Sequence, residues 1–284
     1  MTRLDQALVE RGLCDSREKA KRFILAGQVR INGHPARKPS DHIKPTDELA
    51  LDAVDKFVSR GGHKLEHALE HFQLNVTGLT AIDLGASTGG FTDCLLQRGA
   101  EKVFAVDVGQ GQLAWKLRQD QRVVVMEKTN ARHVRCEDFQ IKGGTFNIQH
   151  STPNIQDSPS GHSLEVGSSR LKVEGSPAVR PPADLIVIDC SFISLKKILP
   201  PAISLLKPDG KIVALIKPQF EAGKAEVDKG RGVITDAAIH ERVLAELQEF
   251  VAAQAGVCWR GVVESPLLGP AGNKEFLVLI EKLR

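Results

Sequence analysis

A glycine-rich turn behind an acidic residue is the first stretch of this chain that could do chemistry. In residues 82–91, IDLGASTGGF, Asp83 closes an apolar run and glycines follow at positions 85, 89 and 90. Three enzyme classes use a turn of this kind. The stretch fits the G-x-S-x-G pattern of α/β-hydrolases, partly fits a dinucleotide-binding loop, and also suits a site for S-adenosylmethionine.

The first two classes lack supporting residues elsewhere in the sequence. A hydrolase needs a downstream acid and then a histidine on a loop, but the last histidine, His240, falls within a predicted amphipathic helix. No HGG-type oxyanion segment is present in the sequence either. The dinucleotide pattern G-x-G-x-x-G fails because Ser87 stands where its middle glycine would be.

The methyl-donor interpretation explains more of the sequence. Asp83 would lie near the ligand, and Asp107, which ends the next apolar run, could accept hydrogen bonds from two ribose hydroxyls. NAD-dependent enzymes use an acid in the same way, so Asp107 does not separate the two classes. The small residues of the turn would let the backbone approach the donor closely; these are Gly85, Ser87, Gly89 and Gly90. A tight turn that binds no ligand is the alternative.

Four ionisable residues lie at the ends of predicted elements. Asp189 follows the apolar run ADLIVI, Lys217 ends GKIVALIK, Glu275 lies in GNKEF, and Lys64 begins a helix after SRGG. One such residue alone is more often a surface charge than a catalyst. Four acids and bases that could meet in one pocket are harder to dismiss, and we refer to them as the tetrad.

The remaining pattern predicts how these residues are positioned. Short, nearly continuous apolar runs alternate with helical patterns, as expected for strands covered on both faces. We therefore expect an α/β fold, a doubly wound, Rossmann-like sheet with its ligand at the carboxyl ends of the strands. The predicted strands span residues 80–85, 102–109, 122–127, 183–192, 210–220, 256–265 and 274–283.

Residues 3–51 form a separate basic α+β module in this interpretation. Leu4, Ala7 and Leu8 have helical spacing, a second helix follows in DSREKAKRFILAGQ, and QVRINGHPA reads as a hairpin. A basic helix face can follow a phosphate backbone, although charge alone more often marks a solvated face. If this face binds phosphates, the candidate contacts are Arg3, Arg17, Lys21 and Arg22.

Composition excludes several classes. The net charge of +3 says little about partners, and 5% aromatic residues without tyrosine argue against extensive base stacking. Five scattered cysteines without a CxxC pair predict neither a disulfide framework nor a metal site. No apolar run is long enough for a membrane span and no secretory signal is recognisable, so we expect a cytoplasmic protein.

Taken together, the motifs resemble a known family. The front module, with RLDxxL, SRxxAxxxI, GxVxxNG and DEL, resembles the RNA-binding domain of ribosomal protein S-four type. The whole chain resembles the TlyA family of FtsJ-like rRNA 2′-O-methyltransferases, some of which are named haemolysin A. The motifs that carry this resemblance are SRGGxKL, DLGASTGGFTDCLL, VDVGxGQL, TNxR, DxSFISL, KPQFE and GNxEFL.

The resemblance implies a domain arrangement and roles for specific residues. An RNA-binding domain at 1–58 would precede a methyltransferase domain at 59–284. The catalytic K-D-K-E residues of the family would be Lys64, Asp189, Lys217 and Glu275. S-adenosyl-L-methionine would bind at residues 83–90 and Asp107, with Asn130 on the adenine side. Ribosomal RNA, as subunits or free, would be the partner, and a cytidine the target.

The tetrad suits methylation of a ribose hydroxyl. A 2′-hydroxyl is a poor nucleophile and must lose its proton as it attacks the sulfonium methyl in line. Our hypothesis is that Lys217 is the base or steers the departing proton, and that Lys64 supplies charge and positions the ribose. Asp189 and Glu275 would orient the two amines. An amine is a base only in its neutral form, which desolvation and nearby positive charge favour; no metal is needed.

One segment departs from the family pattern, and two other functions stay open. Residues 140–182 are rich in Ser, Gly and Pro, and we expect a flexible insertion there. A haemolysin-like, membrane-active protein is one alternative, which the short apolar runs disfavour. An RNA-binding protein without catalysis is the other, which the complete tetrad disfavours.

Overall fold

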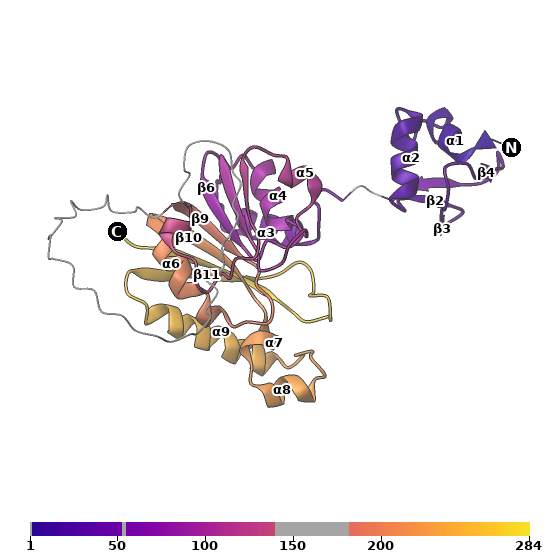
Figure 1. The fold of residues 1–284 in the computed structure, drawn as a ribbon. Coiled ribbons are helices and arrows are strands. Elements are labelled where there is room, and N and C mark those ends of the chain that lie inside the picture. The colour runs from indigo at the N-terminus through magenta and orange to yellow at the C-terminus, as the bar shows by residue number, and fades with distance from the viewer. Residues whose placement is uncertain (1, 53–54, 140–181) are drawn as a thin grey trace, which may run out of the picture. The chain divides into compact units, whose positions relative to one another are not determined.

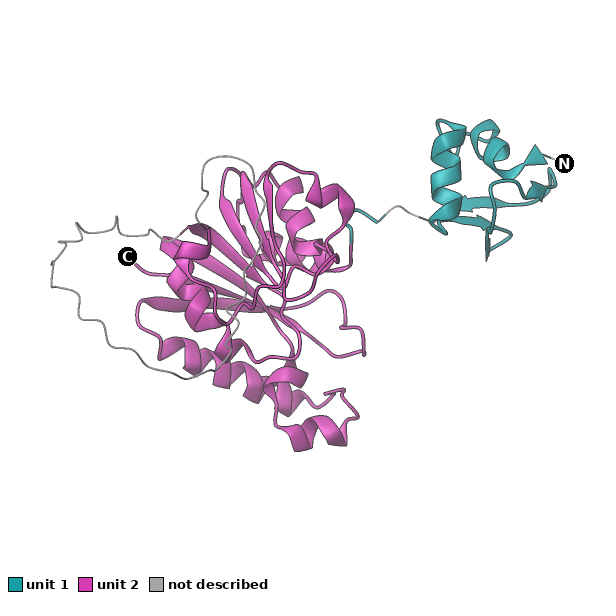
Figure 2. Cartoon of the chain, viewed as in Figure 1, with its two compact units in different colours: residues 1–58 teal, residues 59–284 magenta. Residues whose placement is uncertain are grey.

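The computed structural model describes residues 2–52, 55–139 and 182–284 (Figure 1). The chain divides into two compact units, Met1–Val58 and Ser59–Arg284 (Figure 2). The insertion expected at 140–182 lies outside the described residues apart from residue 182. Each unit has its own apolar core and is described by itself.

The first unit is a small α+β fold. Its helices pack together over a core that includes Leu4, Leu8, Ile24 and Val29, all of them fully or almost fully buried. β1 pairs with β4, and β3, β2 and β5 form a three-stranded sheet. The elements are β1 Thr2–Arg3, α1 Leu4–Glu10, α2 Arg17–Leu25, β2 Val29–Ile31, β3 His34–Pro35, β4 His42–Ile43 and β5 Leu49–Leu51.

Local signals in the sequence explain these boundaries. Ser16 caps α2, because its side chain accepts a hydrogen bond from Lys19 N at 3.3 Å. Gly27, with φ +71°, follows the end of that helix. Asn32 and Gly33 have φ +50° and +80° and form the tight turn between β2 and β3. The predicted second helix and hairpin are thus confirmed.

The second unit contains a seven-stranded sheet in the order β11-β12-β10-β9-β6-β7-β8. The strands β8, β7, β6, β9 and β10 are parallel, whereas β12 runs antiparallel to β10 and β11 runs antiparallel to β12. Their bounds are β6 Thr80–Leu84, β7 Lys102–Val106, β8 Val123–Met126, β9 Ala183–Ile188, β10 Leu206–Ile216, β11 Val257–Glu264 and β12 Phe276–Lys282.

Helices cover both faces of this sheet (Figure 1). α6 and α9 pack their apolar residues into one cluster with strand residues such as Ile186 and Ile188, while α3 and α4 lie on the other face. The helices are α3 Gly61–His71, α4 Gly90–Gln97, α5 Trp115–Arg118, α6 Leu199–Leu205, α7 Pro218–Glu221, α8 Lys224–Lys229 and α9 Ala237–Ala252, with short 3₁₀ turns at Cys136–Phe139 and Leu195–Lys197. The predicted doubly wound α/β fold is confirmed.

The strand order places a crevice at the carboxyl edge of the sheet. From β6 the chain crosses to β7 on one side, and β9 later pairs with the other side of β6. Chain connections therefore diverge beside β6, which is where open α/β sheets bind ligands. The turn that follows β6 at Gly85 lies at this point.

Gly90 allows α3 and α4 to begin in direct contact. A side chain at this position would collide with Ser59 Oγ and would come within 2.8 Å of the backbone nitrogen of Gly62. The start of α3, and with it Lys64, can therefore approach the glycine turn only because position 90 lacks a Cβ.

Replacing Gly90 by alanine is expected to lower the free energy of unfolding by about 1–3 kcal/mol, because backbone must move to make room. Gly61→Ala is the matched control: a Cβ there meets its nearest atom at 3.5 Å, an ordinary contact. Urea unfolding of both variants measures the difference. Equal stabilities for the two variants would contradict the close-approach explanation.

Candidate active site

All four tetrad residues line one pocket of about 260 Å³ at the carboxyl edge of the sheet. The glycine turn after β6 forms part of the same wall, together with Asp83. Three of the four side chains are buried: Lys64 is 6% exposed, Lys217 9% and Glu275 1%. The structure thus brings together residues that are separated by up to 211 positions in the chain.

Lys64 and Glu275 form a buried ion pair between α3 and the segment before β12. The carboxylate is held in place by its own loop, since Ser265 N donates to the Glu275 carbonyl at 2.8 Å and Gly269 packs against the side chain. One oxygen binds Lys64, but Oε1 has no hydrogen-bond partner among the described residues although it is buried.

Lys217 and Asp189 form the second pair. They follow the neighbouring parallel strands β10 and β9, so their side chains meet naturally at the strand ends. Lys217 Nζ lies 2.6 Å from Asp189 Oδ1 and donates a hydrogen bond to Ser191 Oγ at 2.9 Å. The 2.6 Å contact lacks hydrogen-bond geometry, and Asp189 Oδ1 has no other partner among the described residues. The tetrad is therefore two ion pairs that face one cavity.

Asp83 is a fully buried carboxyl group beside these pairs. Its Oδ2 accepts from the backbone nitrogen and the hydroxyl of Thr92, at 2.9 and 2.7 Å. Within the described part of the chain its Oδ1 accepts no hydrogen bond. Burial raises the pKa of Asp83 to about 7, against the lowering effect of the Thr92 hydrogen bonds. A cation bound in the pocket would favour the ionised form.

The glycines of the turn lie against other segments of the protein, which leave no space for a side chain. Gly85 and Gly89 have φ +88° and +97°. A Cβ on Gly85 would lie 2.8 Å from the Asp189 carbonyl oxygen, and one on Gly89 would collide with Leu117. A Cβ on Gly85, Gly89 or Gly90 would meet a neighbouring segment, so packing within the protein already requires glycine at these positions. Glycine at these positions therefore lets the segments around the site pack closely against the turn. The predicted close approach of their backbone to a ligand stays a prediction.

A larger pocket of about 1210 Å³ adjoins the first and shares Gly85, Ser87, Asp189 and Ser191 with it. Two further predicted donor-binding residues, Asp107 and Asn130, line it, whereas Gly89 lines neither pocket. Asp107 accepts from Ser87 N at 2.8 Å and from Gly109 N at 2.6 Å. A carboxylate offers about four acceptor positions, so it keeps capacity for ribose hydroxyls.

Several residues of the site were not singled out from the sequence. Ser191 binds Lys217, and Thr92 binds Asp83. Phe192 is 90% exposed with φ +62°, lines the larger pocket, and its ring centroid lies 5.2 Å from that of Phe220. The DxSF and KPQF motifs contain three of these residues but do not reveal their contacts.

Glu221 fixes the loop that carries Ser191 and Phe192. Its carboxylate accepts from Ser194 Oγ at 2.6 Å and from Leu195 N at 2.7 Å. Burial raises the pKa of Glu221 above its usual value. This contact ties the segment after β9 to α7, which follows Lys217.

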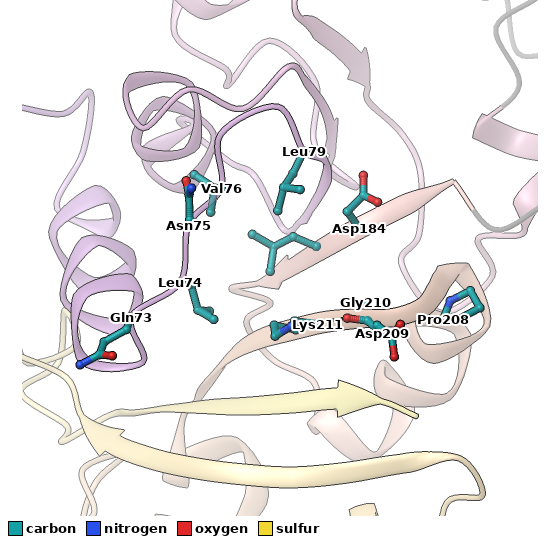
Figure 3. A pocket seen from close by; sticks show the side chains of 11 residues that line it. Gln73, Leu74, Asn75, Val76, Leu79, Asp184, Pro208, Asp209, Gly210 and Lys211 are labelled. Atoms are coloured by element: carbon teal, nitrogen blue, oxygen red, sulfur yellow. Dashed lines mark hydrogen bonds between the residues drawn. The ribbon is translucent and has the colours of Figure 1, made fainter. Parts of the chain in front are cut away.

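A third pocket, of about 430 Å³, lies at the opposite, amino edge of the sheet (Figure 3). Its carboxylates are already satisfied: Asp184 accepts from Thr80 N at 2.9 Å and from Lys207 Nζ at 2.8 Å, and Asp209 pairs with Arg284. None of the tetrad residues lines it. The carboxyl edge is therefore the better candidate for chemistry.

The four predicted RNA contacts lie on the first unit. Arg3 and Arg17 both contact the carboxylate of Asp5, and Lys21 pairs with Glu18 at 2.8 Å. Arg22 is exposed on α2. In the part of the chain that the structure covers, no three His, Cys, Asp or Glu side chains gather as metal ligands would. None of the described helices is long and apolar enough to cross a membrane.

Comparisons with known proteins agree with this geometry. The FtsJ-like methyltransferase model matches residues 57–282 and the S4 domain model matches residues 2–49. The chain is 43% identical to the 16S/23S rRNA (cytidine-2′-O)-methyltransferase TlyA of Mycobacterium tuberculosis, over 97% of this chain and 88% of that protein. A solved structure from Streptococcus thermophilus, described as a hemolysin, is 40% identical with a TM-score of 0.65, over 99% of this chain and 88% of that one.

The raised pKa of Asp83 predicts a specific pH dependence of stability. The folded state holds this proton up to about pH 7, whereas an unfolded aspartate releases it near pH 4. The contribution of Asp83 to stability is therefore complete below about pH 4 and is lost as the pH rises to 7, by about 1.4 kcal/mol for each pH unit.

Urea unfolding of the wild type and of Asp83→Asn, from pH 5 to 8, should give curves that diverge in favour of the variant. Asp120→Asn is the control, because Arg122 lowers the pKa of Asp120 and its titration lies below this window. Parallel curves for wild type and Asp83→Asn would refute the assigned protonation.

Proposed function

This chain belongs to the FtsJ-like methyltransferase family, and from that premise we propose that it methylates a ribose 2′-hydroxyl of ribosomal RNA, at a cytidine, with S-adenosylmethionine as donor. The names of its relatives support the substrate, and the S4 domain supports an RNA partner. The observation that carries the proposal is that both ion pairs of the tetrad and the glycine turn line one pocket. Action on ribosomal RNA implies a cytoplasmic location.

The pocket chemistry fits a positively charged methyl donor. When bound, S-adenosylmethionine supplies an electrophilic methyl group on a cationic sulfur. Asp83 Oδ1 is buried and has no partner among the described residues, so it can compensate a positive charge. Asp107 would hold the ribose hydroxyls, and Asn130 would contact the adenine side. Gly85, Ser87, Gly89 and Gly90 form the turn between these groups.

The Lys217–Asp189 pair is the best placed group to handle the proton of the attacking hydroxyl. Lys217 Nζ and Asp189 Oδ1 lie 2.6 Å apart. We therefore assign the hydroxyl proton to the pair as a unit rather than to the amine alone. Ser191 orients Nζ through its hydrogen bond. During methyl transfer, this pair would accept the proton that the ribose hydroxyl loses.

Lys64 would position the ribose and balance the developing negative charge on the attacking oxygen. Its own charge is compensated by Glu275, which keeps one buried acceptor free. The exposed ring of Phe192 lies beside Ser191 and offers a face for the target base. The arginines of the first unit would bind phosphates of the folded RNA.

The chemical position of the methyl group tests the function. Purified protein, tritiated donor and ribosomal subunits should yield label that stays in alkali-resistant dinucleotides, because a 2′-O-methyl group blocks alkaline cleavage of the adjacent phosphodiester. Label on a base would appear in ordinary mononucleotides and would rule out the proposed chemistry. RNA with a 2′-deoxy sugar at the mapped position should accept no label.

Lys217→Met should reduce methyl transfer by at least about 10²-fold, because it removes the amine of the pair that would take the hydroxyl proton and leaves Asp189 without its ion-pair partner. Donor affinity, measured by calorimetry, should change by less than about threefold. Lys211→Met is the matched control, since Lys211 lies on the same strand and pairs with Glu281 at 3.7 Å, away from the pocket. A fully active Lys217→Met enzyme would exclude Lys217 from the chemistry.

A further inference from the structure

Asp5 is a buried acid in a small domain, and burial of an unpaired charge destabilises a fold. Its exposed fraction is 0%, and it is the only buried polar or charged side chain among the described residues of the first unit. It lies in α1 between Leu4 and Ala7, both of which belong to the apolar core. A carboxylate in such a position requires strong compensation.

Two arginines from different segments provide that compensation. Arg3 precedes α1 and donates from Nε and Nη2 to the two oxygens of Asp5, at 3.1 and 3.3 Å. Arg17 begins α2 and donates from Nη2 to Oδ2 at 2.9 Å. The hydrogen bond from Arg3 is the main cause that lowers the pKa of Asp5 to about 2. The carboxylate therefore stays charged throughout the physiological range.

Both guanidinium groups have N–H donors that do not bind Asp5. A guanidinium carries five N–H donors, and only some of them point at Asp5. In the described part of the chain, Nη1 of Arg3 and both Nε and Nη1 of Arg17 have no hydrogen-bond partner. The side chains are 42% and 53% exposed. The buried Asp5 carboxylate thus holds Arg3 and Arg17 at the N-terminal ends of α1 and α2, while part of each guanidinium stays exposed.

We propose that Asp5 is a positioning residue for RNA binding: it orients Arg3 and Arg17 so that both meet phosphates of the same folded RNA. This inference rests on the RNA-binding role proposed above for the first unit. An arginine side chain loses conformational entropy when it is fixed. Because Asp5 has already restricted both side chains, less of that cost falls on binding.

Net charge alone predicts that removing Asp5 strengthens RNA binding, whereas the proposal predicts that it weakens binding, so one measurement separates the two. Loss of one negative charge strengthens attraction to a polyanion when only net charge matters. Loss of the positioning anion instead frees both arginines and weakens binding. Asp15 is a matched comparison, because it is an exposed acid of the same unit whose ion pair with Lys19 involves neither arginine.

The test uses the full-length protein and deproteinised 23S rRNA as the probe, by filter binding over a series of KCl concentrations. Asp5→Asn should weaken binding about 10-fold and reduce the slope of log K against log salt by about 1.5, as expected for two lost phosphate contacts. Asp15→Asn should bind as tightly as the wild type or slightly tighter. Tighter binding by Asp5→Asn would overturn the proposal.

A second variant guards against misfolding of Asp5→Asn. The double change Arg3→Lys and Arg17→Lys keeps every charge and the buried acid, but an ammonium cannot bridge Asp5 and a phosphate with the fixed fork of a guanidinium. It should lose at least about fivefold in affinity at unchanged net charge. Wild-type affinity in this variant would overturn the positioning role.

The double change Arg3→Gln and Arg17→Gln separates the positioning role of Asp5 from RNA binding by the two arginines. If this variant binds rRNA as well as the wild type, the RNA-binding role of these arginines fails and the positioning role fails with it. If it loses affinity while Asp5→Asn and the lysine variant keep theirs, only the positioning role fails. Weakened binding in all three supports both.

Discussion

Charge burial is the constraint on which the site depends. Two lysines and one glutamate lie almost wholly inside the protein, and each is tolerated there because an opposite charge lies against it. These pairs join α3 to the segment before β12 and join the ends of β9 and β10. The same ion pairs that compensate the buried charges therefore also define the shape of the cavity. In the first unit, Asp5 is compensated in the same way by two arginines.

The sequence predicts the architecture well because strand and helix periodicity is local. Apolar runs identified each strand of the large sheet, and the stretch DSREKAKRFILAGQ identified α2. The residues of the tetrad were singled out by their positions at the ends of predicted elements. The motif resemblance assigned them to one site, since no local pattern joins Lys64 to Glu275 across 211 positions. Their roles stay predictions until tested.

What the sequence could not reveal depends on contacts through space. The partnership of Thr92 with Asp83 depends on how α4 packs on β6, and the clamp formed by Glu221 depends on the loop after β9 folding back on α7. Gly89 and Gly90 were interpreted as donor-binding, and the structure adds a second reason for glycine there, since a side chain would meet Leu117 or the start of α3. A motif identifies which residues matter, whereas packing decides what each one touches.

Asp83 has one carboxyl oxygen without a hydrogen-bond partner among the described residues, and a buried unsatisfied atom weakens the unliganded fold. A ligand that binds only the native state shifts the equilibrium away from unfolded chains. Proteases degrade chains mainly when they open. If the methyl donor binds against this oxygen as proposed, the lifetime of the protein would depend on the concentration of that donor.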